Sequence, residues 1–124
     1  MRYLAAVTSE TLRLRSVLPV NFLEARRDVM LGDVSVPGGT PIFALTRLCS
    51  IQRANFAEPD RFDPERWLGT CPVSAEHPHN PRANFSFGGG PRTCPGRALA
   101  LLECALVISM LVRRLEISHS PQQS

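Results

Sequence analysis

The sequence predicts an α+β fold with two main helices, a small β-sheet and a long irregular segment. Helical periodicity marks both ends of the chain, at about residues 2–15 and 97–113. Between them, short apolar runs around a Gly-Asp pair predict a hairpin and a small sheet within about residues 28–45. Because 124 residues with 44% hydrophobic content can fill only one modest core, we expect residues 1–124 to be one domain or part of one.

The first helix is predicted from residues spaced at steps of three and four, and it stops before Pro19. These residues are Leu4, Val7, Thr11 and Leu14. Glu10 and Arg13 share one face of this helix, as an i,i+3 pair does. Taken alone such a pair is common and contributes only about 0.2–0.5 kcal/mol, so it indicates no function.

The predicted sheet is built on a hairpin of residues 29–31 and 34–36, joined by the two-residue turn Gly32-Asp33. Residues 41–45 are apolar enough for a third short strand, and a short helix is expected within residues 46–55. From residue 56 to residue 84 the chain is rich in proline and lacks periodicity. We expect a long irregular segment there, ordered only by packing against the rest of the chain.

The last predicted helix is apolar nearly all round, which is typical of a helix buried inside a larger protein. Its apolar run, residues 98–112, is interrupted by Glu103 and is too short to span a bilayer. We therefore expect a buried helix and no membrane segment in this chain.

Charge and cysteine content exclude further classes. The net charge of +3 comes from arginines interleaved with eleven acidic residues, so no basic stripe for nucleic acid forms. The cations are all arginine, which suggests a GC-rich genome, and we expect a bacterial source. The four cysteines match no secreted scaffold and no signal peptide precedes them, so we expect reduced thiols and a cytoplasmic protein.

One loop carries the chemistry. Residues 88–90 are three glycines, which allow the backbone to approach a flat partner closely. Arg92 offers a rigid fork of donors suited to a carboxylate. Cys94 follows just ahead of the last helix, where unpaired amides and the helix dipole favour an anion. The loop is therefore suited to a cysteine thiolate that acts as a metal ligand or nucleophile.

The pattern Phe-x-x-Gly-x-Arg-x-Cys-x-Gly resembles the cysteine-ligand signature of the cytochrome P-450 family. The residues that match it are Phe87, Gly90, Arg92, Cys94 and Gly96. Two further family motifs occur in the right order. Glu10 and Arg13 match the Glu-x-x-Arg of the family's K helix, and residues 64–67 match its Pro-Glu-Arg-aromatic motif.

The resemblance implies the haem-binding part of a mainly helical fold, a single partial domain over residues 1–124. It implies haem b as cofactor, with Cys94 as the metal ligand, Arg92 beside a propionate and Phe87 packed near the ligand loop. Gly90 and Gly96 complete the implied cofactor-binding set. Glu10, Arg13 and Arg66 would form the family's buried ion triad, a structural feature in which loss of one member costs about 3–5 kcal/mol.

The implied activity is that of a monooxygenase, which activates O2 to oxidise a small organic substrate. An electron donor, either a ferredoxin, a flavodoxin or a reductase, would dock at the proximal face. The family's oxygen-activating helix and substrate loops have no counterpart here, so we expect the chain alone to be incomplete and inactive. Met1 falls inside the implied K helix, which suggests an internal methionine of a longer or disrupted reading frame.

Three alternatives stay open at this point. The chain could be a non-catalytic haem-binding module, an inert product of a truncated gene, or a thiol-based redox protein that lacks the usual Cys-x-x-Cys spacing. The remaining cysteines, Cys49, Cys71 and Cys104, are interpreted as small buried hydrophobic residues. His77 and His79 lie in a proline-rich loop without further ligands, so we expect solvated side chains and no metal site there.

Overall fold

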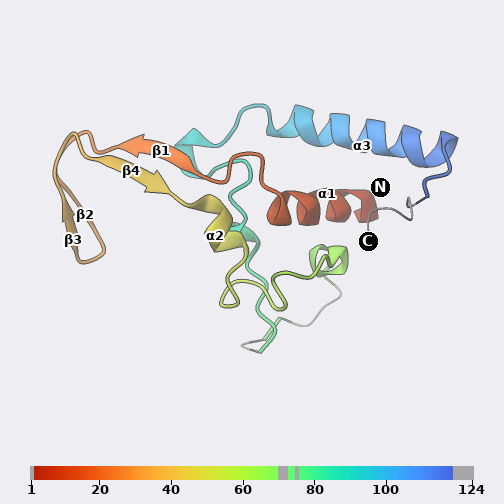
Figure 1. Cartoon of the computed structure of the whole chain (residues 1–124), viewed down its shortest axis with the longest axis horizontal. Coiled ribbons are helices and arrows are strands. Elements are labelled where there is room, and N and C mark those ends of the chain that lie inside the picture. The colour runs from red at the N-terminus through yellow and green to blue at the C-terminus, as the bar shows by residue number, and fades with distance from the viewer. Residues whose placement is uncertain (1, 70–72, 75, 119–124) are drawn as a thin grey trace.

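The computed structural model describes residues 2–69, 73–74 and 76–118. Its main helices are α1 (Arg2–Leu14) and α3 (Arg97–Arg114), which pack against each other although they lie at opposite ends of the chain (Figure 1). A short helix, α2 (Thr46–Ser50), also contacts α1. The predicted α+β architecture is confirmed, and the boundaries of the two main helices agree with the sequence to within one residue.

Two separate antiparallel pairs form the β-structure. β2 (Val29–Leu31) and β3 (Val34–Val36) make the predicted hairpin, with Gly32 in the left-handed region at φ +59°. β4 (Pro41–Ala44) is the predicted third strand, yet it pairs with β1 (Asn21–Glu24) and not with the hairpin. Figure 1 shows the hairpin at the far end of the β1–β4 ribbon, away from the helices.

The strand β1 was not predicted. Its sequence, Asn-Phe-Leu-Glu, is only four residues long and has no alternation of apolar and polar positions. Pairing with β4 supplies what the local sequence lacks, because Phe22 and Phe43 meet edge to face with ring centroids 5.2 Å apart. The strand is therefore fixed by a cross-strand contact that no short window of sequence contains.

The centre of the molecule is ionic. The largest fully buried side chains are Arg13, Phe56, Glu10 and Ser50, and the buried hydrophobic residues other than Phe56 are small. On α1 the buried positions are Ala6, Thr8, Glu10 and Arg13, whereas the predicted stripe from Leu4 to Leu14 is half-buried or exposed. The face that α1 buries is therefore set by its charged pair and not by its apolar residues.

The predicted irregular segment is confirmed, and α1 is the element that orders it. The segment contains two short 3-10 turns, η1 (Pro64–Trp67) and η2 (Pro81–Ala83), and η1 packs directly on α1. The two arms of the segment also pair with each other, through a bridge between Phe56 and His79 and a hydrogen bond from the Asn80 amide to the Asn55 carbonyl at 2.8 Å.

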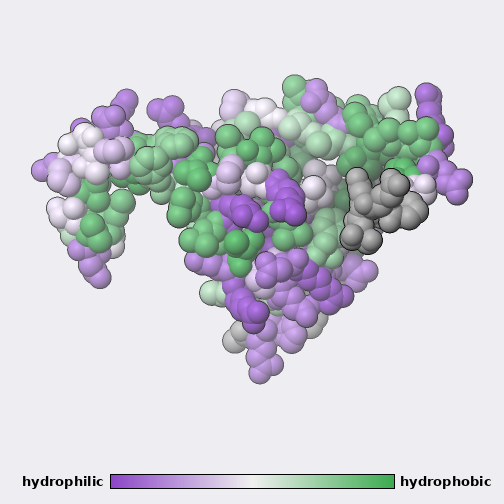
Figure 2. Space-filling model, in the orientation of Figure 1, coloured by the Kyte–Doolittle hydropathy of each residue, from purple (hydrophilic) through white to green (hydrophobic). Residues whose placement is uncertain are grey.

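The expectation that the last helix is buried is wrong for this chain. None of the residues of α3 is buried, because α1 covers only part of it. Several large apolar side chains of α3 are exposed, namely Leu99, Leu102, Leu106, Val107, Met110, Leu111 and Val112. Figure 2 shows hydrophobic surface along this helix. Cys104 is exposed on it as well, contrary to its interpretation as a buried residue.

Candidate functional site

The loop ahead of α3 folds back on itself and presents Cys94. The Cys94 amide donates to the carbonyl oxygen of Phe87 at 2.8 Å, and the Thr93 amide donates to that of Gly90 at 3.1 Å. Gly88 and Gly90 have φ angles of +72° and +63°, values that glycine adopts without steric cost. A short 3-10 turn, η3 (Gly90–Arg92), begins at the second of these glycines and leads towards the cysteine.

Cys94 is exposed at the amino end of α3, and its carbonyl accepts the Arg97 amide at 3.3 Å. Within the described part of the chain, no donor reaches its Sγ atom. Gly96 stands beside the sulfur, so that a methyl group built on it would lie 3.7 Å from Sγ. Arg92 is also exposed and forms no ion pair with a described residue. Phe87 is half-buried.

On α1, the carboxylate of Glu10 accepts five hydrogen bonds. Arg13 donates to it from Nε and Nη2, both at 2.9 Å. Arg66 Nε donates at 3.1 Å and the Asp63 amide at 3.0 Å. The fifth donor is the indole nitrogen of Trp67, at 2.8 Å. The structure thus brings Glu10, Arg13 and Arg66 together in one buried cluster.

The same arginines bind the irregular segment. Arg13 Nη1 donates to the carbonyl oxygens of Ser50 and Pro59, at 2.8 and 2.6 Å. Its guanidinium carbon lies 5.1 Å from the centroid of the Phe56 ring. Arg66 Nη1 donates to the Ala57 carbonyl at 3.1 Å. These contacts give hydrogen-bond partners to backbone carbonyls of the irregular segment, which has no regular secondary-structure hydrogen bonding there.

The electrostatics of the cluster follow from this geometry. Burial raises the pKa of Glu10. Hydrogen bonds from Arg13, the Asp63 amide and Trp67 together lower it by more, so the pKa lies below its usual value of 4.5. The second carboxylate, Asp63, has Oδ2 3.8 Å from Arg66 Nη2. Two carboxylates therefore face two guanidinium groups, and the buried charge is balanced.

Sequence reasoning missed two members of this centre. Trp67 was identified only as the aromatic residue of a motif, yet its indole N–H is one of the donors to Glu10. His79 was expected to be solvated, but it packs edge to face on Trp67 and on Phe56, with centroid distances of 5.0 and 5.5 Å. Its Nδ1 atom is buried and has no hydrogen-bond partner among the described residues.

The surroundings of His79 favour its neutral form. Burial lowers the pKa of His79 below its usual 6.5, and the positive charge of Arg66 lowers it further, while Glu10 partly opposes this. The neighbouring His77 is exposed, as expected. Within the described ranges no group of three potential ligands is placed so that it could hold a metal ion.

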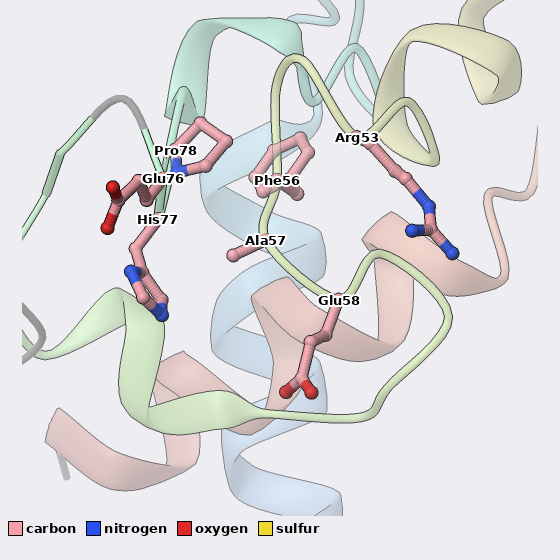
Figure 3. Close-up of a pocket in the computed structure, with 7 residues that line it drawn as sticks. All are labelled: Arg53, Phe56, Ala57, Glu58, Glu76, His77 and Pro78. Atoms are coloured by element: carbon pink, nitrogen blue, oxygen red, sulfur yellow. The ribbon is translucent and has the colours of Figure 1, made fainter.

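A shallow cleft of about 340 Å³ lies between the two arms of the irregular segment, as Figure 3 shows. Its lining comes from residues 53–58 and 76–78, with Arg53, Glu58 and Glu76 giving mixed charge. The cleft contains none of the residues of the cysteine loop. We assign no role to it.

The other cysteines have no shared site. Cys49, Cys94 and Cys104 carry free thiols, and Cys49 is half-buried. Cys71 lies outside the described residues. Over the stretch that the structure covers, no helix has the length and apolar character needed to cross a membrane.

Comparisons with known proteins identify the family. The profile described as Cytochrome P450 matches residues 1–124. The human mitochondrial 25-hydroxyvitamin D-1 alpha hydroxylase is 37% identical over 118 residues, and a (1S)-1-hydroxy-luvungin A synthase of Citrus sinensis is 36% identical over 121 residues. These matches cover 95% and 96% of the chain. The expected bacterial source has no support from them, because these relatives are eukaryotic.

Solved structures agree. The retinoic acid-bound cyanobacterial CYP120A1 has a TM-score of 0.85 at 28% identity over 99% of the chain, and a zebrafish cytochrome P450 has a TM-score of 0.82 at 31% identity over 99%. The chain spans 22–23% of the length of the two sequence relatives and 28% of each of these structures. With a family match over its whole length, the chain belongs to the cytochrome P450 family of haem-thiolate monooxygenases.

Proposed function

We propose that this chain provides the thiolate side of a haem site, with Cys94 as the metal ligand. The observation that carries the proposal is the exposure of Cys94 at the amino end of α3, in a loop whose backbone is held by the Cys94–Phe87 hydrogen bond. At a helix amino end the unpaired amides and the dipole favour the thiolate over the thiol.

The residues of the loop fit haem b. Sulfur is a suitable donor for haem iron. Gly88 and Gly90, which adopt positive φ angles, have no side chains, so the turn before the cysteine allows a close approach of the backbone. Arg92, exposed and free of ion pairs with the described residues, is proposed to meet a propionate. Phe87, Gly90 and Gly96 complete the proposed cofactor-binding set. When bound at Cys94, haem iron supplies the activation of O2.

We assign a structural role to Glu10, Arg13 and Arg66. Their cluster is closed to solvent and binds backbone carbonyls of the irregular segment. It therefore supports the fold on which the cysteine loop is mounted and takes no part in the chemistry.

For the whole protein we propose oxidation of a small organic substrate with O2, with electrons from a ferredoxin, a flavodoxin or a reductase. The hydroxylase among its relatives supports the reaction class and leaves the substrate open. Arg92 and Arg97 are exposed near the amino end of α3, and their positive charge suits an acidic electron-donor protein. We retain a cytoplasmic location as a prediction, although several of the relatives are mitochondrial. We expect no turnover from the chain alone, because productive chemistry with O2 requires that water be excluded from the haem.

Haem reconstitution tests the proposal. The chain is mixed with haemin, reduced and exposed to carbon monoxide, and a red-shifted Soret band of thiolate-ligated iron is expected. Cys94→Ser abolishes this band, whereas Cys104→Ser, which alters an exposed thiol on α3, retains it. A thiolate spectrum that persists in Cys94→Ser, or the absence of haem uptake by the unaltered chain, contradicts the proposal.

A further inference from the structure

Two polar side chains fasten the segment before the cysteine loop to the end of α1. Ser86 Oγ lies 3.0 Å from the carbonyl oxygen of Leu12, and Asn84 Nδ2 lies 3.5 Å from that of Ser9. The Ser86 amide donates to Asn84 Oδ1 at 3.3 Å. The single hydroxyl proton of Ser86 has two acceptors within reach, the Leu12 carbonyl and this same Asn84 oxygen. No sequence motif singled out either residue.

The carbonyl of Leu12 needs a donor from outside its helix. It is among the last four carbonyls of α1, which have no intrahelical partner. Within the described chain no backbone amide donates to it. Such a carbonyl also lies at the negative end of the helix dipole, which strengthens its attraction for a hydroxyl proton. Ser86 therefore completes the carboxyl end of α1.

Ser86 directly precedes Phe87, the residue whose carbonyl binds the Cys94 amide. The next residue, Phe87, accepts the Cys94 amide through its carbonyl at 2.8 Å. The side chain of Cys94 is exposed and receives no donor from the described residues, so the position of its sulfur depends on this backbone. One hydrogen bond on each side of residues 86 and 87 thus joins α1 to Cys94.

We propose that Ser86 is a positioning residue for Cys94, which ties the cysteine loop to the last turn of α1 and fixes the place of the sulfur on the fold. Asn84 orients the serine from the side, since its own amide group is bound to Ser9. This inference rests on the proposed role of Cys94 as a haem ligand and names the residue that holds the ligand loop in place.

Amide hydrogen exchange on the haem-free chain tests the inference directly. In Ser86→Ala the Cys94 amide exchanges about tenfold faster, the factor that corresponds to the loss of one ordinary hydrogen bond, while the Arg15 amide keeps its rate. Ser86→Thr retains the hydroxyl and restores slow exchange. Ser16→Ala is the matched control, because it removes a serine bond to the Leu18 carbonyl at the same end of α1. Unchanged exchange at Cys94 in Ser86→Ala overturns the inference.

A second measurement needs no variant, in case Ser86→Ala does not fold. Amide exchange is measured on the unaltered chain at increasing urea concentrations. The probes are the Cys94 amide and the Arg15 amide, which donates to the Thr11 carbonyl. If α1 and the loop form one unit, both amides open with the same free energy and the same urea dependence. Opening of Cys94 while Arg15 stays protected refutes the tie.

The spectrum of the haem-loaded chain separates this inference from the proposed function. Ser86→Ala lowers the fraction of iron that gives the thiolate Soret band with carbon monoxide, and Ser86→Thr restores it. If the unaltered chain takes up no haem, the function fails and the exchange experiments still decide the role of Ser86. If the chain gives the thiolate band and Ser86→Ala changes neither band nor exchange, only the role of Ser86 fails.

Discussion

Glu10 is the residue on which the described fold depends most. Its carboxylate is fully buried and accepts from Arg13 on the same helix and from side chains and backbone of one distant stretch, residues 63–67. Desolvation of two guanidinium groups is tolerated only because this carboxylate and Asp63 lie against them. The cluster therefore stabilises the fold as a unit, and each member is costly to remove while the others stay.

We expect Glu10→Gln to lower the free energy of unfolding by about 3–5 kcal/mol, because it leaves two buried cations with Asp63 as their one remaining counter-charge in the cluster. Urea unfolding followed by circular dichroism measures the change. The chain offers a matched control in Glu58→Gln, since Glu58 and Arg61 form a second i,i+3 pair at 2.8 Å that is exposed. The control leaves stability unchanged, and an equally small effect of Glu10→Gln would falsify the structural role of the cluster.

Acid adds a pH signature to the same variant. The pKa of Glu10 is depressed in the folded state, so its contribution is fully present above its usual value of 4.5 and is lost as pH falls towards the folded value. We expect the unaltered chain to lose stability in this range. Glu10→Gln makes the curve flatter there, and an identical slope in both proteins would assign the acid sensitivity to other carboxylates.

At the residue scale the sequence predicts the motif members and misses their neighbours. The spacing of Glu10 and Arg13 on a helix, with Arg66 in a second motif, is sufficient to expect a cluster. Nothing in the sequence around Trp67 or His79 states which way the side chain points, because that depends on the return of the chain past Phe56. A polar residue in a proline-rich loop is most often solvated, and His79 is an exception.

Among the elements, the irregular segment relies most on contacts with others. Its two arms are joined by the Phe56–His79 bridge and by the packing of His79 against Phe56 and Trp67. Phe56 is completely buried under the guanidinium of Arg13. The segment is thus held by rings stacked on the ion cluster, which compensates for its lack of regular hydrogen bonding.

This packing makes the segment sensitive to protons. His79 has a depressed pKa in the folded state, so its packing is fully stabilising above 6.5 and weakens as pH falls through that value. We expect the free energy of unfolding, measured by urea titration across this range, to decrease with acid. His79→Gln removes this part of the slope and the control His77→Gln, at an exposed position, preserves it. A slope that survives in His79→Gln contradicts the assignment.

Elements with a local signal were predicted, and those fixed by distant partners were not. The hairpin β2–β3 has its own turn at Gly32, and α3 has a long helical pattern, so both could be located from sequence. The strand β1 and the bridge at Phe56 are each specified by a residue about twenty positions away. The buried face of α1 was misjudged for a related reason, since its charges attract partners that the periodicity of apolar residues does not reveal.

Considered as a whole, the molecule exposes an unusual amount of apolar surface along α3. The helix offers a row of leucine, valine and methionine side chains on its outer side (Figure 2). Contiguous apolar patches of this kind are typical of surfaces that contact other protein.

We expect the chain to bind hydrophobic dyes and to associate with itself at high concentration, as sedimentation would detect. Leu106→Glu lowers both effects and changes the free energy of unfolding by no more than about 0.5 kcal/mol, since Leu106 is 52% exposed. Val17→Glu, at an exposed position away from α3, leaves dye binding unchanged. Strong destabilisation by Leu106→Glu would show instead that the residue is buried in solution.

The hydrogen bonds of Glu10 also constrain the order of events during synthesis. Its donors at Asp63, Arg66 and Trp67 lie 53, 56 and 57 positions downstream, so they leave the ribosome long after the carboxylate does. Until these donors are available, burial of the Glu10–Arg13 pair is unfavourable, so we expect the pair to stay solvated. This helix emerges before the residues that bind its carboxylate, so it is among the last parts of the described fold to reach its final environment.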